Sequence, residues 1–387
     1  MMIHKQPHAQ VSVAEEQTQR MILDGHKLPW HMDRVAAWER GERIAPITID
    51  MALTRKCDAA CSFCYAMLQE NDGGMITEEV MNGFLEDCAA MGVRAVSLVS
   101  DGESLLSPAY VFTVQRGREL GLSIASGTNG RTFTPAILSA VLPSLDYLRF
   151  NVSAGQKERY AEIMGFKPEA FDRVCANIKE AVRIKHVGCG GQIYPVTIGI
   201  QMVLMPQDAD QILPFAQLGL DMGVDYAVIK HCSDDEDGRL GVRYSEYEKL
   251  HGLLYQAEGM STPETKIVVK WNKIRDEGRR EYQRCYGPPF LIQISGSGLV
   301  APCGMLFNDR YAKFHIGNIT EQRWMDIWKS ERYWEVMQYL GSENFNAQKM
   351  CGTLCLQHMV NTALDRHVKG DRVQPATTPA PLHRNFV

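Results

Sequence analysis

Three cysteines near the start of the chain have the spacing of a metal-binding loop. Cys57, Cys61 and Cys64 lie within eight residues, directly after an alternating apolar segment that is typical of a β-strand. Such a loop can wrap three thiolates around one soft metal centre. A closed zinc site needs a fourth ligand, and no histidine lies nearby to supply it. A [4Fe–4S] cube held by three cysteines instead keeps one iron without a protein ligand.

A second group of cysteines lies in the last third of the chain. Cys285, Cys303, Cys351 and Cys355 supply four thiolates, which is enough for a fully ligated metal site. His358 is close in sequence and could replace one of them. The same four cysteines would also satisfy tetrahedral zinc, so zinc is the alternative to an iron–sulfur cluster at this site.

The other four of the eleven cysteines, Cys88, Cys175, Cys189 and Cys232, are scattered. In a cytosolic chain, clustered cysteines indicate metal or redox chemistry rather than a disulfide framework. We expect a cytoplasmic protein without a membrane span. No apolar run approaches the roughly 20 residues that cross a bilayer, and the N-terminus lacks the apolar core of a signal peptide.

Strand-like and helix-like segments alternate between residues 47 and 230. A helix is expected over residues 78–91, where Thr77 can cap the start and Gly92 can end it. Strands that alternate with helices imply a parallel sheet, either doubly wound or rolled into a barrel. The six strands are expected at residues 47–53, 93–100, 122–126, 147–152, 196–204 and 224–230.

Polar residues follow the ends of these strands. Because the carboxyl ends of parallel strands meet at one edge of a sheet, we expect these side chains to form one site. They are the clustered cysteines after the first strand, Asp101-Gly102-Glu103 after the second, Thr128 and Asn129 after the third, Asn151 and Ser153 at the fourth, and Lys230-His231-Cys232 at the sixth.

The CxxxCxxC spacing, with the aromatic residue Phe63 before its last cysteine, resembles the signature of the radical S-adenosylmethionine (SAM) superfamily. The resemblance implies that Cys57, Cys61 and Cys64 hold a [4Fe–4S] cluster whose free iron binds SAM. It also implies reductive cleavage of SAM to a 5′-deoxyadenosyl radical, which abstracts hydrogen from a substrate. The resemblance covers residues 47–230, about half of the chain.

The resemblance extends to the strand ends. Residues 100–103 resemble the Gly-Gly-Glu element whose acidic residue contacts the amino group of SAM, although Asp101 replaces one glycine. Residues 148–153 resemble the strand that contacts the ribose and carboxylate, and residues 198–203 resemble the strand that meets adenine. The SAM-binding residues implied in this way are Phe63, Asp101, Gly102, Glu103, Thr128, Asn129, Asn151, Ser153 and Gln201.

The second cysteine group resembles an auxiliary-cluster domain of the same superfamily. In that domain a cysteine, a hairpin with Gly-xxxx-Cys spacing (here Gly298 and Cys303) and a later cysteine pair surround one [4Fe–4S] cluster. The long form of the domain, SPASM, carries seven cysteines and two clusters. The short form, twitch, carries one cluster and matches the four cysteines here better. A cluster with four cysteine ligands has no iron free for substrate and is expected to transfer electrons.

These features predict an α/β fold, a partial (β/α)6 radical SAM barrel followed by a small α+β, twitch-like auxiliary-cluster domain. The expected boundaries are residues 1–45 for an N-terminal extension, 46–260 for the barrel, 261–369 for the auxiliary-cluster domain and 370–387 for a Pro-rich tail. We expect this tail to be extended or disordered.

The net charge of −5 provides no basic field to attract nucleic acid or an anionic membrane. One local basic stretch, residues 273–280, could meet an acidic substrate. Because its charges alternate, we expect it instead to be a solvated helix face.

Three residues at the end of the sixth strand are candidate catalytic groups. Cys232 could return a hydrogen atom to a substrate radical, although an ordinary buried cysteine is the simpler interpretation. Lys230 or His231 could act as a general base or bind an anionic substrate. Lys270 and Trp271 are further candidates for the substrate pocket.

The expected function is that of a radical SAM oxidoreductase or epimerase. Its expected substrate is a polar small molecule of sugar, aminocyclitol or nucleotide type, and its electron donor a protein such as flavodoxin or ferredoxin. The alternatives are a maturase of ribosomally made peptides (RiPPs), modification of a nucleobase or nucleic acid, and a zinc-stabilised binding module that is not an enzyme. The roughly 45 residues before the first strand are few for a peptide-recognition domain.

Overall fold

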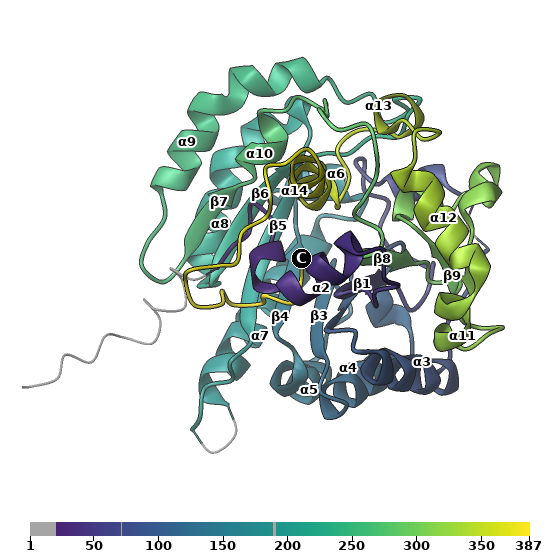
Figure 1. The fold of residues 1–387 in the computed structure, drawn as a ribbon. Helices are drawn as coiled ribbons and strands as arrows, with labels where there is room; N and C mark the ends of the chain where they lie inside the picture. Colours follow the sequence, from purple (N-terminus) through teal and green to yellow (C-terminus); the bar gives the residue numbers. More distant parts are fainter. Residues whose placement is uncertain (1–20, 71, 189–190) are drawn as a thin grey trace, which may run out of the picture.

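The computed structural model describes residues 21–70, 72–188 and 191–387. The first 20 residues of the expected N-terminal extension and the scattered Cys189 lie outside the described residues. Figure 1 shows strands that curve around a central space, with helices on their outer side. No helix of the described part is long and apolar enough to cross a membrane.

One sheet runs through the described chain, in the order β10-β9-β8-β1-β2-β3-β4-β5-β6-β7. Neighbouring strands from β8 through β1 to β7 pair in parallel, whereas β9 and β10 are antiparallel additions at one edge. The strands are β1 (Thr48–Met51), β2 (Ala95–Leu98), β3 (Ser123–Thr128), β4 (Tyr147–Asn151), β5 (Thr197–Leu204), β6 (Tyr226–His231), β7 (Lys266–Val269), β8 (Leu291–Ile294), β9 (Leu299–Ala301) and β10 (Gly317–Asn318).

Helices connect the parallel strands, and α3, α4, α5, α7, α8 and α9 pack side by side in this order on the outer face. They are α2 (Met32–Glu39), α3 (Glu78–Met91), α4 (Tyr110–Glu119), α5 (Pro135–Val141), α6 (Lys157–Met164), α7 (Glu169–Val187), α8 (Ile212–Met222), α9 (His251–Gly259), α10 (Trp271–Ile274), α11 (Trp324–Lys329), α12 (Glu331–Gly341), α13 (Ala347–Met350) and α14 (His358–Val368).

Local sequence explains the ends of α3. The Thr77 side chain accepts a hydrogen bond from the amide of Val80, and Gly92 ends the helix in the left-handed conformation, both as predicted. Trp271, a candidate for the substrate pocket, begins the short helix α10 directly after β7.

Strand alternation decides which side chains reach the centre of the barrel. On β4, Leu148 and Phe150 pack into the main hydrophobic core beneath the helices. Tyr147, Arg149 and Asn151 therefore point to the opposite face, toward the barrel interior. The core thus lies between the sheet and its outer helices, and the interior is left with polar side chains.

The predicted α/β fold with a partial parallel barrel is confirmed, with one addition. Strands β7 and β8, which lie beyond residue 260, pair in parallel with β6 and β1 and so extend the barrel sheet itself. The predicted hairpin of residues 291–301 is present as β8 and β9. The domain boundaries stay a prediction, but the sheet is continuous across the boundary expected at residue 260.

The end of the chain closes the amino-terminal side of the barrel. The Lys27 amine donates hydrogen bonds to the carbonyls of His383 (2.9 Å) and Phe386 (2.7 Å). The Thr48 hydroxyl donates to the Asn385 carbonyl (2.6 Å), and the Phe386 ring packs edge-on against Tyr147. In Figure 1 the yellow C-terminal end accordingly lies in the middle of the strands.

Candidate active site

The CxxxCxxC loop leaves the end of β1 and is held against the end of α6. The amide of Ala60 donates to the carbonyl of Met164 (3.1 Å), and the amide of Ser62 donates to the carbonyl of Ile163 (2.9 Å). These two bonds come from backbone groups, so they fix the path of the loop and leave the cysteine side chains free to bind a metal centre.

Cys57, Cys61 and Cys64 lie near one another as free thiols. Burial raises the pKa of Cys57 to about 12 and also raises those of Cys61 and Cys64, and the proximity of the other thiols adds to the shift at Cys57 and Cys61. Bound iron would reverse this effect by stabilising the thiolates. Within the described ranges, no three His, Cys, Asp or Glu side chains are placed around a single metal ion. The role of these thiols as ligands stays a prediction.

Glu103 lies directly behind this loop, with its carboxylate buried. One oxygen accepts hydrogen bonds from the Thr128 hydroxyl (2.9 Å) and the Leu105 amide (3.3 Å), and the other accepts from the Asn129 amide (2.7 Å). Burial raises the pKa of Glu103 to about 7. A carboxylate held in this way fits the implied contact with the amino group of SAM, which stays a prediction.

The Asp101 carboxylate joins two parts of the fold. Its two carboxylate oxygens accept hydrogen bonds from the Ser295 hydroxyl (2.7 Å) and the Gly296 amide (2.9 Å), both in the turn between β8 and β9. The Arg55 guanidinium also lies 2.9 Å away. These partners hold the carboxylate inside the fold, and the implied contact of Asp101 with SAM stays a prediction.

The remaining predicted SAM-binding side chains meet at the carboxyl ends of β3, β4 and β5. Asn151 and Gln201 are paired residues of β4 and β5, and the Gln201 amide donates to the Asn151 side-chain oxygen (2.9 Å). Ser153 is buried with φ of +55°, a strained backbone that often marks a functional site. The side-chain amide of Asn129 donates to the Asp58 carboxylate in the cysteine loop (2.7 Å).

The second cysteine group lies around one largely apolar cavity, which all four of its thiols line. Burial raises the pKa values of Cys285, Cys303 and Cys351, the last to about 11, and the proximity of the other thiols, Cys355 included, adds to each shift. Four thiols that line one apolar pocket fit an auxiliary cluster with four cysteine ligands.

Lys273 and Arg280 contact this second cysteine group. The prediction that residues 273–280 form a solvated helix face is therefore wrong for these two residues. Lys273 is buried, and its amine donates to the Cys355 carbonyl (2.7 Å). The Arg280 guanidinium donates to the Thr353 carbonyl (2.6 Å) and to the Cys351 thiol. Helix α10 ends at residue 274, and the chain beyond it turns back toward the thiols, where positive charge offsets that of thiolates.

His358 is not placed to replace a cysteine. Its Nε2 atom lies 2.7 Å from the Asp276 carboxylate, and its Nδ1 atom lies 3.3 Å from the Tyr282 hydroxyl. Both ring nitrogens are therefore engaged away from the thiols.

The three candidate catalytic residues of β6 and its end point in different directions. Lys230 and Cys232 share the inner face, whereas His231 is buried on the outer face among the rings of Tyr244 and Tyr247. Burial lowers the pKa of His231, so the ring is neutral there. The structure thus brings Lys230 toward the barrel interior and keeps His231 away from it.

Cys232 has no accessible surface. Its thiol donates to the carbonyls of Phe63 (3.6 Å) and Ser233 (3.7 Å), which places it against the CxxxCxxC loop. Burial raises the pKa of this thiol to about 12. Its predicted role as a hydrogen donor stays untested, and the described cavities do not reach it.

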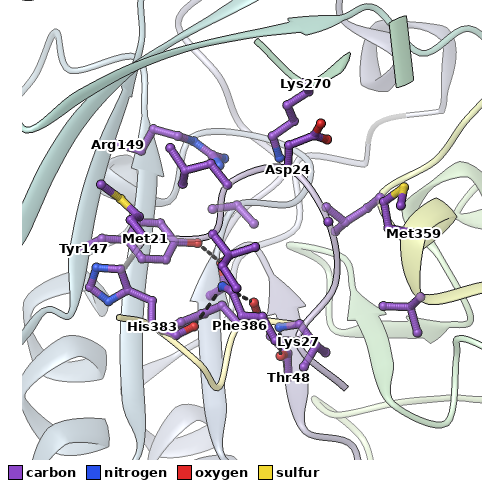
Figure 2. Close-up of a pocket in the computed structure, with 18 of the residues that line it drawn as sticks. Met21, Asp24, Lys27, Thr48, Tyr147, Arg149, Lys270, Met359, His383 and Phe386 are labelled. Carbon is purple, nitrogen blue, oxygen red and sulfur yellow. Dashed lines mark hydrogen bonds between the residues drawn. The ribbon is translucent and has the colours of Figure 1, made fainter. Parts of the chain in front are cut away.

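A cavity of about 150 Å³ occupies the amino-terminal half of the barrel interior. Figure 2 shows Arg149 and Lys270 at its upper end and His383 and Phe386 at its lower end. Sequence reasoning overlooked Arg149 and Asp50, which also line this cavity. The signal was present, because both residues interrupt apolar strand segments at positions of the inner face.

Two protein-family models match the chain. The model described as the radical SAM superfamily matches residues 51–218, and the model described as an iron–sulfur cluster-binding domain, SPASM, matches residues 285–355. The first match includes the CxxxCxxC loop, and the second begins and ends at cysteines of the second group.

Curated relatives are distant. The chain is 24% identical to the AdoMet-dependent heme synthase of Methanosarcina barkeri, over 74% of this chain and 83% of that protein. It is 20% identical to a tungsten-containing aldehyde ferredoxin oxidoreductase cofactor-modifying protein of Pyrococcus furiosus, over 73% of this chain and 81% of that protein.

Solved structures share the fold. SuiB of Streptococcus suis, bound to its precursor peptide SuiA, has a TM-score of 0.60 at 15% identity, over 80% of this chain and 70% of SuiB. anSMEcpe with bound AdoMet has a TM-score of 0.57 at 12% identity, over 85% of this chain and 98% of that one. These TM-scores show a common fold, whereas identities this low leave the substrate open.

Proposed function

We propose, on the premise that this chain belongs to the radical SAM superfamily and carries a SPASM iron–sulfur domain, that it oxidises a polar small molecule bound inside its barrel. Its cofactors are SAM, the [4Fe–4S] cluster that binds SAM, and an auxiliary [4Fe–4S] cluster. The proposed substrate is of sugar, aminocyclitol or nucleotide type, and the proposed electron donor is a flavodoxin or ferredoxin.

The observation that carries this proposal is the cavity inside the barrel. Its volume of about 150 Å³ suits one six-membered ring of such a substrate, since cavities of this size accept benzene. Its lining includes Asp50, Ser97 and Arg149 from the inner faces of three strands. Polar groups converging in a pocket are typical of a site for a polar ligand.

We assign the cofactors to the two thiol groups. Cys57, Cys61 and Cys64 would hold the SAM-binding cluster, and the four thiols that line the second cavity would hold the auxiliary cluster. When bound, these groups supply one-electron chemistry, the reductive cleavage of SAM at the first cluster and removal of an electron from the substrate at the second. Glu103 and Asn151 would orient SAM at the strand ends.

Lys230 is the group that we propose to accept the proton that the substrate releases. It lies on the inner face of β6, two residues before the buried Cys232. Burial and the nearby charge of Arg149 lower the pKa of its amine to about 7. An amine with such a pKa is partly unprotonated at neutral pH, which suits a general base. Loss of one hydrogen atom, one electron and one proton gives a two-electron oxidation.

We favour oxidation over epimerisation because of Cys232. An epimerase needs a hydrogen donor that faces the substrate, whereas this thiol has no accessible surface and points to the carbonyl of Phe63. In deuterated water, an oxidised product should carry no new C–D bond, and the Cys232→Ala enzyme should still form product. Deuterium at the reacting carbon, lost in Cys232→Ala, would instead assign epimerisation.

A peptide maturase is the second candidate, favoured by the shared fold with SuiB, whose structure holds a precursor peptide. The chain covers 70% of SuiB, so part of that protein has no counterpart in the alignment. A peptide would also need an open groove, whereas residues 382–387 and Lys27 close one side of the cavity here.

The first experiment is to measure iron, sulfide and the visible spectrum of anaerobically purified protein. The wild type should hold about eight irons, and the Cys57→Ala/Cys61→Ala/Cys64→Ala variant about four, with loss of reductive SAM cleavage. About four irons in the wild type would remove the auxiliary cluster from the proposal. Zinc in a colourless protein would overturn the proposal and favour a binding module.

A further inference from the structure

Two half-buried cations line the barrel cavity, and their charged groups form no hydrogen bond or ion pair with the described residues. The guanidinium of Arg149 lines the cavity, and its Nε atom is buried without a hydrogen-bond acceptor. The Lys270 amine, at the end of β7, also lines the cavity and has neither a hydrogen bond nor an ion pair in the described part of the chain. Figure 2 shows both side chains at the same end of the cavity.

Unpaired buried charge is costly, so such groups normally have partners. The acidic groups nearby are Asp50 and Asp24, which also line the cavity. Asp24 accepts a hydrogen bond from the Asn272 amide (3.1 Å), and burial raises the pKa of Asp50 to about 7, which leaves it partly uncharged. Neither acid forms an ion pair with Arg149 or Lys270 in the described structure.

Further positive charge surrounds this pair. Lys273 lines the same cavity, although its amine is already bound to the Cys355 carbonyl. Lys230 is next to Lys270 across the β6–β7 ladder, where Ile229 pairs with Val269. Burial and the charges of Lys273, Lys230 and Arg149 lower the pKa of Lys270. Lys27 lines the cavity as well, so the basic side chains around it outnumber the two acids, and an anion would relieve the repulsion among those that are protonated.

Backbone geometry leaves room for the guanidinium. At Gly127 on β3, a Cβ atom would lie 3.3 Å from an Nη atom of Arg149 and 2.9 Å from Val99. The absence of a side chain at Gly127, which pairs with Arg149 across β3 and β4, therefore lets the guanidinium lie over β3. This fork of N–H donors can bind two oxygens of one oxyanion at once.

We propose that Arg149 and Lys270 bind an oxyanion of the substrate, a phosphate or a carboxylate group. The inference rests on the proposed function, because it names the part of the substrate that enters this cavity. Arg149 lies two residues before Asn151 on the same face of β4, which corresponds to about 7 Å along the strand. The anion thus lies nearer to the amino-terminal ends of the strands than the proposed SAM site does. From there it directs the rest of the substrate toward SAM.

The test is binding of inorganic phosphate and of acetate to the anaerobic, cluster-loaded enzyme with SAM present, at constant ionic strength, by calorimetry. At least one anion should bind saturably to the wild type. Arg149→Met and Lys270→Met should each weaken that binding at least about tenfold, whereas Lys249→Met, an exposed control, should leave it unchanged. Arg149→Lys should retain part of it. Preference for phosphate assigns a phosphorylated substrate, and preference for acetate assigns a carboxylate.

The proposal is overturned if neither anion binds the wild type, or if both substitutions leave binding intact. Thermal unfolding checks that the variants fold, and their melting temperatures should not fall, because each removes an unpaired buried charge. Reductive SAM cleavage by the wild type, measured in parallel, separates the two proposals. Cleavage without anion binding rejects the oxyanion site alone, whereas no cleavage rejects the proposed function.

Discussion

Charged residues of this barrel are of two kinds: some bind other parts of the fold, and others form no hydrogen bond or ion pair in the described structure. Asp101 belongs to the first kind, since its carboxylate ties the end of β2 to the turn after β8. Arg149 and Lys270 belong to the second, because they bring charge into the interior without a partner in the described structure. Charge that the fold leaves unneutralised is a better guide to function than charge that it pairs.

Asp50 gives a prediction about pH. Its pKa is about 7 in the folded protein and near 3.8 when unfolded, so the unfolded chain loses the proton first as pH rises. The free energy of unfolding of the wild type should therefore decrease as pH rises from about 3.8 to about 7. Asp50→Asn has no such carboxyl group, so its stability should not decrease for this reason. The stability of the variant relative to wild type should increase by about 2 kcal/mol from pH 5.5 to 7, measured by denaturant unfolding.

Asp33→Asn is the control, since Asp33 is an exposed carboxylate beside Arg94. Its stability difference from wild type should stay nearly constant over the same pH range. A constant difference for Asp50→Asn as well would mean that the carboxyl group keeps an ordinary pKa in the barrel.

At the scale of elements, the loops after the strands depend on close backbone contacts. Gly102, between β2 and the buried Glu103, has φ of +84°, and a Cβ atom there would lie 2.1 Å from the carbonyl oxygen of Thr54. The loop after β2 is thus packed against the start of the cysteine loop. Any shift at this contact would move the Glu103 carboxylate.

Gly102→Ala should consequently destabilise the protein and weaken SAM binding at least about tenfold, because both the backbone conformation and the contact with Thr54 are lost. Gly121→Ala is the matched control, since Gly121 has φ of +80° with no atom within 4 Å. It should cost only about 1–2 kcal/mol of stability and leave SAM affinity unchanged. Equal effects of the two substitutions on SAM affinity would show that the contact has no such role.

At the scale of the whole molecule, the barrel is completed by distant parts of the chain. Residues 21–25, α14 and residues 382–387 all contribute to the wall of the cavity. The sheet itself ends at β7 and β10, so it does not close into a full barrel. These separate segments surround a small space where an eight-stranded parallel barrel would be filled by its own side chains.

Phe386→Ala tests this closure. The ring is buried against Ala95, Ala125 and Tyr147, so its removal should destabilise the protein by about 3 kcal/mol. Arg384→Ala is the control, because the Arg384 side chain is exposed and only its carbonyl oxygen contacts the fold, at His31. It should change the free energy of unfolding by less than about 0.5 kcal/mol. Similar small effects for both would mean that the segment packs only loosely.

The sequence by itself determined the strand and helix pattern, the cap at Thr77, the cysteine groupings and the gathering of polar residues at the strand ends. These features are local, because caps and alternation act over a few residues. The alternation of side chains along a strand also predicts that Lys230 and His231 point in opposite directions.

Only the tertiary structure decided which distant groups meet. Three sets of contacts join segments more than 70 residues apart. They are the hydrogen bonds of Asp101 with residues 295–296, the contacts of Lys273 and Arg280 with the second cysteine group, and the packing of Phe386 against Tyr147. Such contacts follow from packing of the whole chain, which no local pattern encodes. The partnerless Arg149 and Lys270 emerged in the same way, because the absence of a partner is visible only when every neighbour is in place.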